Sequence, residues 1–229
     1  MNLLIEQKKI GVVTVLSGLI ALACFIAMLI AVNFNNAVLS DPLLILSTAG
    51  INITAVRWSM ILDMFGYYLL LLPVIYLLND WMKQRSAWSN MVTFCGIAYV
   101  LIGSIGASVL AVIWPKIIAA FSFANLTEKQ ILKANFSLIN DMVYSGMWNL
   151  LEMTFASVWW IFIGFQFLKN NFKFIGWLSI ITGIFCVGDA TSGVFLIGWL
   201  HELSLNAYLL FSIIWAIAIG IFMMKRPLK

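Results

Sequence analysis

Charged residues are scarce in this sequence: Asp, Glu, Lys and Arg make up 10% of its 229 residues, against about a quarter in an average soluble domain. Proline (4 residues) and histidine (1 residue) are also rare, whereas hydrophobic residues reach 63%. So little polar surface cannot cover a soluble core of this size, which excludes an ordinary soluble domain. The composition therefore predicts an all-α integral membrane protein, a polytopic helix bundle for which lipid is the solvent.

The residues needed for common catalytic or metal chemistry are also few. The cysteines Cys24, Cys95 and Cys186 fall inside apolar stretches without metal-ligand spacing, so we interpret them as small buried hydrophobic residues. A lone histidine is a weak basis for a metal site. No zinc-protease, hydrolase or phosphate-loop motif occurs. We expect no metal and no cofactor, and an enzyme using buried acids is the weaker interpretation because no nucleophile accompanies them.

Apolar stretches of about 17–25 residues, the length that crosses a bilayer, occur six times. They lie near residues 10–32, 57–78, 91–113, 145–168, 174–199 and 206–224. The first stretch continues past Cys24 and is too long for a signal peptide, so we expect a retained helix. We predict one membrane domain, 1–229, whose longer outer loops are 33–56 and 114–144.

The basic residues are distributed unequally between the two predicted sides of the membrane. One side has nine: Lys8, Lys9, Lys83, Arg85, Lys169, Lys173, Lys225, Arg226 and Lys229. The other side has four: Arg57, Lys116, Lys129 and Lys133. Because the richer side is normally cytoplasmic, both termini are predicted to lie in the cytoplasm. These short clusters follow the span ends and form no basic stripe, so we expect lipid and no nucleic acid as a partner.

The predicted loops contain recognisable turn signals. Residues 40–42 (SDP) indicate a turn or a helix start. Residues 127–130 (TEKQ) fit a capping box, followed by a short amphipathic helix that we expect on the outer surface or over the bundle mouth. The short segment 169–173 predicts a tight turn, which makes the fourth and fifth spans antiparallel neighbours.

Three acids interrupt the apolar spans: Asp63, Glu152 and Asp189. An ionisable residue inside a span costs ~2.5–3.5 kcal/mol on insertion scales and normally faces the protein interior or a wet cavity. All three lie six to ten residues inside the outer ends of their spans, hence at similar depth. We therefore predict a shared polar pocket in the outer half of the membrane.

Other polar residues near these acids complete the predicted cavity. The candidate set is Asp63, Tyr67, Asn149, Glu152, Asp189, Arg57 and His201. Asp63 should be buried toward the fourth or fifth span, within hydrogen-bond reach of a polar group. It should not pair with Arg57, because residues six apart on a helix differ by ~120° in direction. The alternative is purely structural: Arg57, Lys116 or His201 pairs with an acid and ties helices together.

Two segments resemble a family of uncharacterised bacterial six-helix membrane proteins, a domain of unknown function. The first is residues 63–69 (DMFGYYL), followed by leucines and a basic turn. The second is residues 164–168 (GFQFL), a short basic turn and residues 176–178 (GWL). The family often has proline in that turn, whereas residues 169–173 contain none. The resemblance implies a bacterial inner-membrane protein and brings no activity or catalytic residues.

Two hypotheses about function remain open from the sequence. The first is a small transporter, channel or cation- or proton-responsive protein with an outward-facing acidic cavity for a small cation or small-molecule ligand. The second is a non-enzymatic membrane scaffold or accessory subunit whose partner is another membrane protein. In that case the buried polar residues would only specify helix packing.

Overall fold

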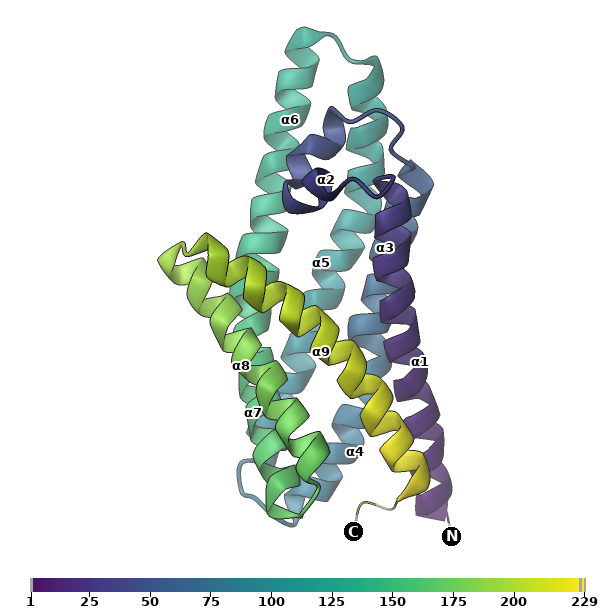
Figure 1. The fold of residues 1–229 in the computed structure, drawn as a ribbon, viewed down its shortest axis with the longest axis vertical. Coiled ribbons are helices and arrows are strands. Elements are labelled where there is room, and N and C mark those ends of the chain that lie inside the picture. Colours follow the sequence, from purple (N-terminus) through teal and green to yellow (C-terminus); the bar gives the residue numbers. More distant parts are fainter. Residues whose placement is uncertain (1, 227, 229) are drawn as a thin grey trace.

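Within residues 2–226 and 228, which this computed structural model describes, six helices are long and apolar enough to cross a membrane, and no strand occurs. The predicted all-α, multi-pass architecture is therefore confirmed (Figure 1). The short α2 (Asn36–Ser40) and η1 (Pro42–Leu46) lie between the first two spans. The spans are α1 (Asn2–Ala31); α3 (Ile53–Asp63) with η2 (Met64–Tyr68), η3 (Leu69–Leu71) and α4 (Leu72–Lys83); α5 (Ser89–Phe123); α6 (Leu126–Asn140) with η4 (Asp141–Glu152) and α7 (Met153–Lys169); α8 (Lys173–Phe195); and α9 (Gly198–Lys225).

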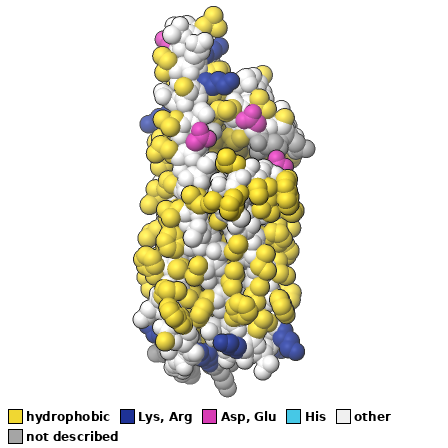
Figure 2. All heavy atoms as spheres, turned by 90° about the vertical axis from the view of Figure 1, so that its left-hand side faces the viewer, with side chains coloured by type: hydrophobic (Ala, Val, Ile, Leu, Met, Phe, Trp, Pro, Cys, Tyr) yellow, Lys and Arg dark blue, Asp and Glu magenta, His cyan; other side chains and the backbone are white. Residues whose placement is uncertain are grey.

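The surface of the bundle carries a broad apolar band. Figure 2 shows hydrophobic side chains covering the middle of one face, with Lys and Arg gathered toward its two ends. Leu19, Leu101 and Phe165 are each about half exposed (49%, 49% and 51%). Soluble proteins rarely expose contiguous apolar surface of this extent. The band is therefore the surface that faces lipid, and the chain is a multi-pass membrane protein.

The two ends of the chain meet at one end of the bundle (Figure 1). Gln7 Nε2 donates to the carbonyl oxygens of Met223 (2.8 Å) and Arg226 (2.7 Å). The Gln7 Oε1 atom accepts a hydrogen bond from the Leu228 N–H (3.0 Å). These contacts tie the start of α1 to the end of α9, so these two helix ends lie at the same end of the bundle. Lys229, one of the basic residues assigned to this side, lies outside the described residues.

The segment 114–144, predicted as an outer loop, is mostly helical. α5 runs on through Pro115 and has 35 residues, about 52 Å at 1.5 Å per residue, whereas the hydrocarbon core is about 30 Å thick. Trp114 Nε1 donates to Asn140 Oδ1 (2.7 Å), and its ring stacks on Phe136 with centroids 5.5 Å apart. The structure differs from the prediction because packing between α5 and α6 keeps both helical beyond the apolar run.

The helix that follows, α6, begins earlier than predicted and runs along the long axis of the bundle. The Glu128 N–H donates to Asn125 Oδ1 (3.0 Å) and the Asn125 N–H to Glu128 Oε2 (2.9 Å), so the capping box starts two residues before Thr127. α6 does not lie on the outer surface, because it continues through η4 into α7 as one 44-residue helix, Leu126–Lys169. Figure 1 shows α5 and α6 as a hairpin projecting beyond the other helices.

The segment between the first two spans folds against this hairpin. As predicted, a helix starts at Pro42: Asp41 Oδ1 accepts from the Leu43 N–H (3.0 Å), and Pro42 occupies the first turn of η1. Ile45 is buried in the same core as Trp114. The end of the bundle remote from the termini therefore has a small core of its own, to which the end of α1, the segment α2–η1, α3, α5, α6 and η4 contribute.

At the opposite end, α7 and α8 are joined by the predicted tight turn. Asn171 adopts a left-handed conformation (φ 62°), and the Phe172 N–H donates to the Phe167 carbonyl oxygen (2.9 Å). A Cβ atom at Gly164 would lie 2.9 Å from the Gly176 carbonyl oxygen. Glycine at both positions lets the two backbones approach closely, which confirms that these helices are antiparallel neighbours.

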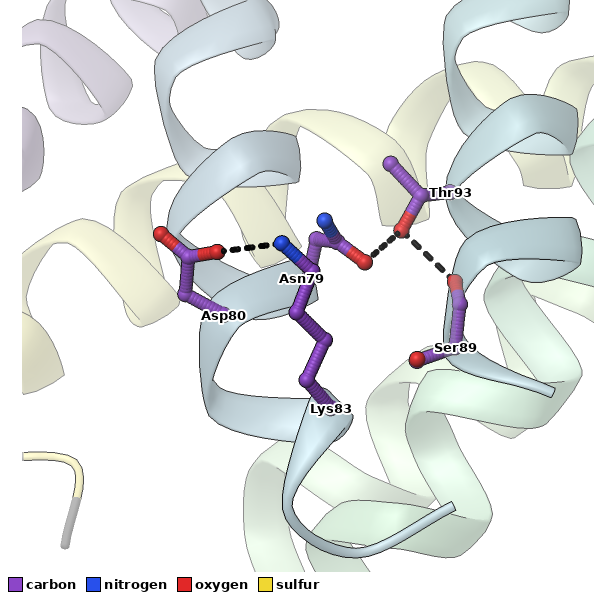
Figure 3. Close-up of polar contacts among 5 residues, drawn as sticks. All are labelled: Asn79, Asp80, Lys83, Ser89 and Thr93. Carbon is purple, nitrogen blue, oxygen red and sulfur yellow. Dashed lines mark hydrogen bonds and ion pairs between the residues drawn. The ribbon is translucent and has the colours of Figure 1, made fainter. Parts of the chain in front are cut away.

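A polar cluster links α4 to α5 near the same end (Figure 3). The buried Thr93 hydroxyl lies 2.8 Å from Asn79 Oδ1 and 2.8 Å from the Ser89 carbonyl oxygen. Beside it, Lys83 Nζ and Asp80 Oδ1 form an exposed ion pair at 3.0 Å. The buried part fixes the packing of the two helices, whereas an exposed pair contributes little to stability.

Candidate functional site

Two of the three acids predicted inside the spans line the same cavity. Asp63 is the last residue of α3, and Glu152 is the last residue of η4. Their side chains are 9% and 0% exposed. The cavity has a volume of about 160 Å³ and lies between α1, the α3–η2 segment, η4 and α9. The sequence analysis placed these acids at one depth, and the structure brings them to one site.

The other walls of the cavity are mainly apolar and aromatic. α1 contributes Cys24, Phe25 and Met28, and the outer part of α9 contributes Leu205, Tyr208 and Leu209. None of the described residues that line the cavity is Lys, Arg or His. The two carboxyl groups therefore have no basic partner within the cavity.

Both acids adjoin a π-helical segment. A π turn holds one residue more than an α turn and changes the direction of the side chains that follow, and such segments are frequent at functional sites. η2 directs Tyr67 and Tyr68 to the cavity, and η4 directs Tyr144, Trp148 and Asn149 to it. Two helices that would otherwise be regular are thus both distorted where they face the cavity.

Hydrogen bonds from buried tyrosine hydroxyls support this distorted region. Tyr68 Oη donates to Glu152 Oε2 (3.2 Å), which joins η2 to η4. Tyr99 on α5 donates to the Tyr67 carbonyl oxygen (2.8 Å), and Tyr208 on α9 donates to the Tyr99 hydroxyl (3.0 Å). All of these side chains are buried. Tyr68 therefore holds one oxygen of Glu152 in place, and the separate pair Tyr208 and Tyr99 holds a backbone carbonyl of η2.

One oxygen of each cavity acid has no partner. Among the described residues, Asp63 Oδ2 and Glu152 Oε1 are buried and accept no hydrogen bond. A buried carboxylate with neither a hydrogen bond nor a counter-ion is strongly unfavourable. Each group must therefore carry a proton or face a cation. The arrangement can bind and release positive charge, and it does not favour an anion.

The third acid, Asp189, belongs to a different contact. Its side chain is fully buried in α8, and Asp189 Oδ1 lies 2.6 Å from Nδ1 of His201 on α9. Neither residue lines the cavity. The left-handed Leu196 (φ 55°) turns the chain between the two helices. This pair ties α8 to α9 across their short connection, which is the structural role that the sequence analysis kept open for His201.

The remaining predicted residues separate into two groups. Tyr67 and Asn149 are buried and line the cavity. Arg57 is exposed near the start of α3, and no ion pair joins it to Asp63 in the described part of the chain. Asp63 is buried toward the fourth span, as predicted, since it lines the cavity with Asn149 and Glu152. The hydrogen bond predicted for its carboxyl group is absent among the described residues.

Sequence reasoning missed several aromatic residues of the cavity. Tyr67 was found because it follows Asp63 by four residues, one turn of a regular helix. Tyr68 follows by five, which an α-helix would place ~140° away, and only the wider π turn brings both tyrosines to the cavity. Trp148 and Tyr208 carry no signal in their own helices, because they reach the cavity through the packing of η4 and α9.

We compared the chain with protein-family models, with curated proteins and with solved structures, and none of the three comparisons gives a match. The resemblance to the bacterial six-helix family therefore stays a prediction. What is established is a multi-pass helical membrane protein in which two acids, two π-helical segments and several aromatic side chains line one cavity.

Proposed function

We propose that this protein is a small cation- or proton-responsive membrane protein, of transporter or channel type, and that its cavity is the binding site. One observation carries the proposal: Asp63 Oδ2 and Glu152 Oε1 are buried without hydrogen-bond partners in a cavity that no described Lys, Arg or His lines. Asp189 also has one buried oxygen without a partner, but its other oxygen lies 2.6 Å from His201, a basic group that can supply the compensating positive charge. Asp63 and Glu152 have no such basic group among the described residues that line their cavity.

The chemistry that follows is an exchange of positive charges. Two carboxylates in one apolar cavity cannot both stay charged without compensation, because each raises the cost of ionising the other. When the cavity is empty, protons supply the compensation. A cation that enters supplies it instead, and a proton leaves. The hydrogen bond from Tyr68 to Glu152 supports the ionised form of that acid once the cation is present.

Flux measurements in proteoliposomes test this function. We expect the wild-type protein to carry protons or cations down an imposed gradient, and Asp63→Asn and Glu152→Gln each to reduce the rate by about tenfold or more. Asp80→Asn is the matched control, because Asp80 is an exposed acid outside the cavity. Internal pH is followed with an encapsulated dye. Equal rates in all four proteins would remove the proposal.

The orientation and location are part of the same proposal. The end that holds both termini also carries Lys8, Lys9, Lys83, Arg85, Lys169, Lys173, Lys225 and Arg226. We infer that this end faces the cytoplasm, in a bacterial inner membrane, because translocation disfavours positively charged loops. The cavity then lies in the outer half of the membrane, since its α1 residues are near the end of α1 and its α9 residues near the start of α9.

Cysteine labelling of intact cells checks the orientation. A membrane-impermeant maleimide should modify cysteines introduced at Ser47 or Lys129, and it should not modify those at Gln84 or Asn170. The wild type is the control, because its three cysteines are buried. Labelling at Gln84 in intact, impermeable cells would reverse the orientation.

A further inference from the structure

The size and wall chemistry of the cavity allow its ligand to be specified further. We propose that the cavity binds a small organic ammonium ion with an apolar body, and that this ion arrives from the lipid between α1 and α9. The inference rests on the proposed function, because it assumes that the Asp63–Glu152 cavity is a binding site for positive charge. It adds a chemical class of ligand and a route.

The volume sets the size of the ligand. Each water-sized group takes about 10–15 Å³ of such space, so a cavity of about 160 Å³ holds roughly ten to fifteen non-hydrogen atoms. A benzyl group joined to a small ammonium head has this size. A phospholipid or a large dye is too big to fit completely, and a single metal ion would leave most of the space empty.

The walls favour an organic cation over a hydrated inorganic ion. Aromatic rings of Tyr67, Tyr68, Tyr144, Trp148 and Tyr208 line the cavity. Aromatic faces attract ammonium ions and also contact apolar groups. Hard metal cations need about six to eight oxygen ligands, and the apolar and aromatic walls supply few to replace a hydration shell. An ammonium ion already carries its apolar substituents, and it places one positive charge near Asp63 and Glu152.

The contacts between α1 and α9 indicate where the ligand passes. Toward the termini the two helices touch closely: a Cβ atom at Gly11 would lie 2.7 Å from the Gly220 carbonyl oxygen, and one at Gly18 would lie 3.2 Å from the Ile213 carbonyl oxygen. Beyond that contact α9 runs away from α1 toward its own start (Figure 1). Among the described residues, no glycine contact brings α1 and α9 together in that part.

The residues that border the cavity on these two helices face outward in part. Phe25 on α1 is 50% exposed, and Leu205 and Leu209 on α9 are partly buried, while all three line the cavity. All three residues lie within α1 and α9, which are two of the membrane-spanning helices. The cavity is therefore bordered by side chains that also belong to the lipid-facing surface. An ammonium ion with an apolar body can place that body among the acyl chains while its charge stays close to the headgroups, whereas a hydrated inorganic ion has no apolar part to bury there.

Binding is tested with a defined probe and an uncharged molecule of the same shape. The probe is radiolabelled benzyltrimethylammonium, measured by equilibrium dialysis against the full-length protein in lipid nanodiscs. The matched competitor is neopentylbenzene, in which carbon replaces the charged nitrogen. We expect saturable binding of one probe per chain, no displacement by neopentylbenzene, and about tenfold or greater loss in Asp63→Asn and Glu152→Gln. Asp80→Asn should bind as the wild type does.

The route is tested by the rate of association. Leu205→Trp places a bulky ring at the border of the cavity, and Leu203→Trp places the same ring at an exposed position of α9 that does not line it. We expect Leu205→Trp to slow association about fivefold or more relative to Leu203→Trp, with a smaller change in Kd. Equal association rates in the two variants would overturn the lipid route.

The outcomes separate this inference from the proposed function. If Asp63→Asn and Glu152→Gln abolish proton flux but benzyltrimethylammonium does not bind the wild type, the proposed function stands and the ammonium ligand is wrong. If neither flux nor binding is detected, both fail. If the probe binds equally to wild type and both variants, or neopentylbenzene displaces it, charge recognition is absent and the inference is overturned.

Discussion

Replacing Gly66 by alanine will separate α1 from the η2 segment and lower the free energy of unfolding by about 3 kcal/mol or more. A Cβ atom at this position would collide with the Ala21 backbone nitrogen, and it would lie 2.7 Å from the Ala21 Cα and 2.8 Å from the carbonyl carbon of Ile20. These are backbone atoms, so no side-chain rotation relieves the contact. Overpacking typically costs 1–3 kcal/mol, and roughly the upper end or beyond applies where a whole helix must shift.

The same substitution elsewhere provides the control. A Cβ at Gly193 in α8 meets nothing within 4 Å, so Gly193→Ala should leave stability unchanged or raise it by up to about 1 kcal/mol. Reversible unfolding in mixed detergent, followed by tryptophan fluorescence or circular dichroism, measures both variants. Because Cys24 and Met28 on α1 line the cavity, Gly66→Ala should also weaken cation binding. If the Gly66→Ala protein is as stable as the wild type, α1 does not pack against η2 at Gly66 as described.

Replacing Trp215 by alanine will lower the free energy of unfolding by about 3–5 kcal/mol. The Trp215 ring is fully buried on α9, with its centroid 4.4 Å from that of Trp160 and 5.6 Å from that of Trp159. Its Nε1 donates to Ser179 Oγ on α8 (2.8 Å). In lipid, helices associate mainly through packing and interhelical hydrogen bonds, and this substitution removes both at a point where three helices meet.

Two further variants divide the effect into its parts. Trp215→Phe keeps a ring but loses the N–H donor, so it should cost about 1–3 kcal/mol. Trp199→Ala removes an exposed indole (69%) at the start of α9 and should change stability by less than about 0.5 kcal/mol. The same detergent unfolding assay compares all three. If Trp215→Ala and Trp199→Ala unfold alike, the buried tryptophan cluster does not join α9 to α7 and α8.

The sequence by itself determined the class of the protein and the number of its spans. The reason is physical: a bilayer accepts only backbone that is internally hydrogen-bonded, so each crossing requires about 20 apolar residues in a helix. The tight turn between α7 and α8 was predicted for a different reason: so short a connection, residues 170–172 in the structure, can join only helices that are neighbours. The burial of Asp63, Glu152 and Asp189 followed from the cost of exposing an acid to lipid.

Only the tertiary structure decided which acids meet and what surrounds them. The sequence predicts a similar depth in the membrane for all three acids. Depth alone does not predict the direction in which each helix points its side chain. The π segments η2 and η4 set that direction for the residues near Asp63 and Glu152, while Asp189 turns to His201. Helices that are hydrophobic on every side show almost no apolar periodicity. The sequence therefore could not predict which sides of α1 and α9 face the interior of the bundle. The lengths of α5 and α6 were missed because packing between them, and not lipid, keeps them helical outside the membrane.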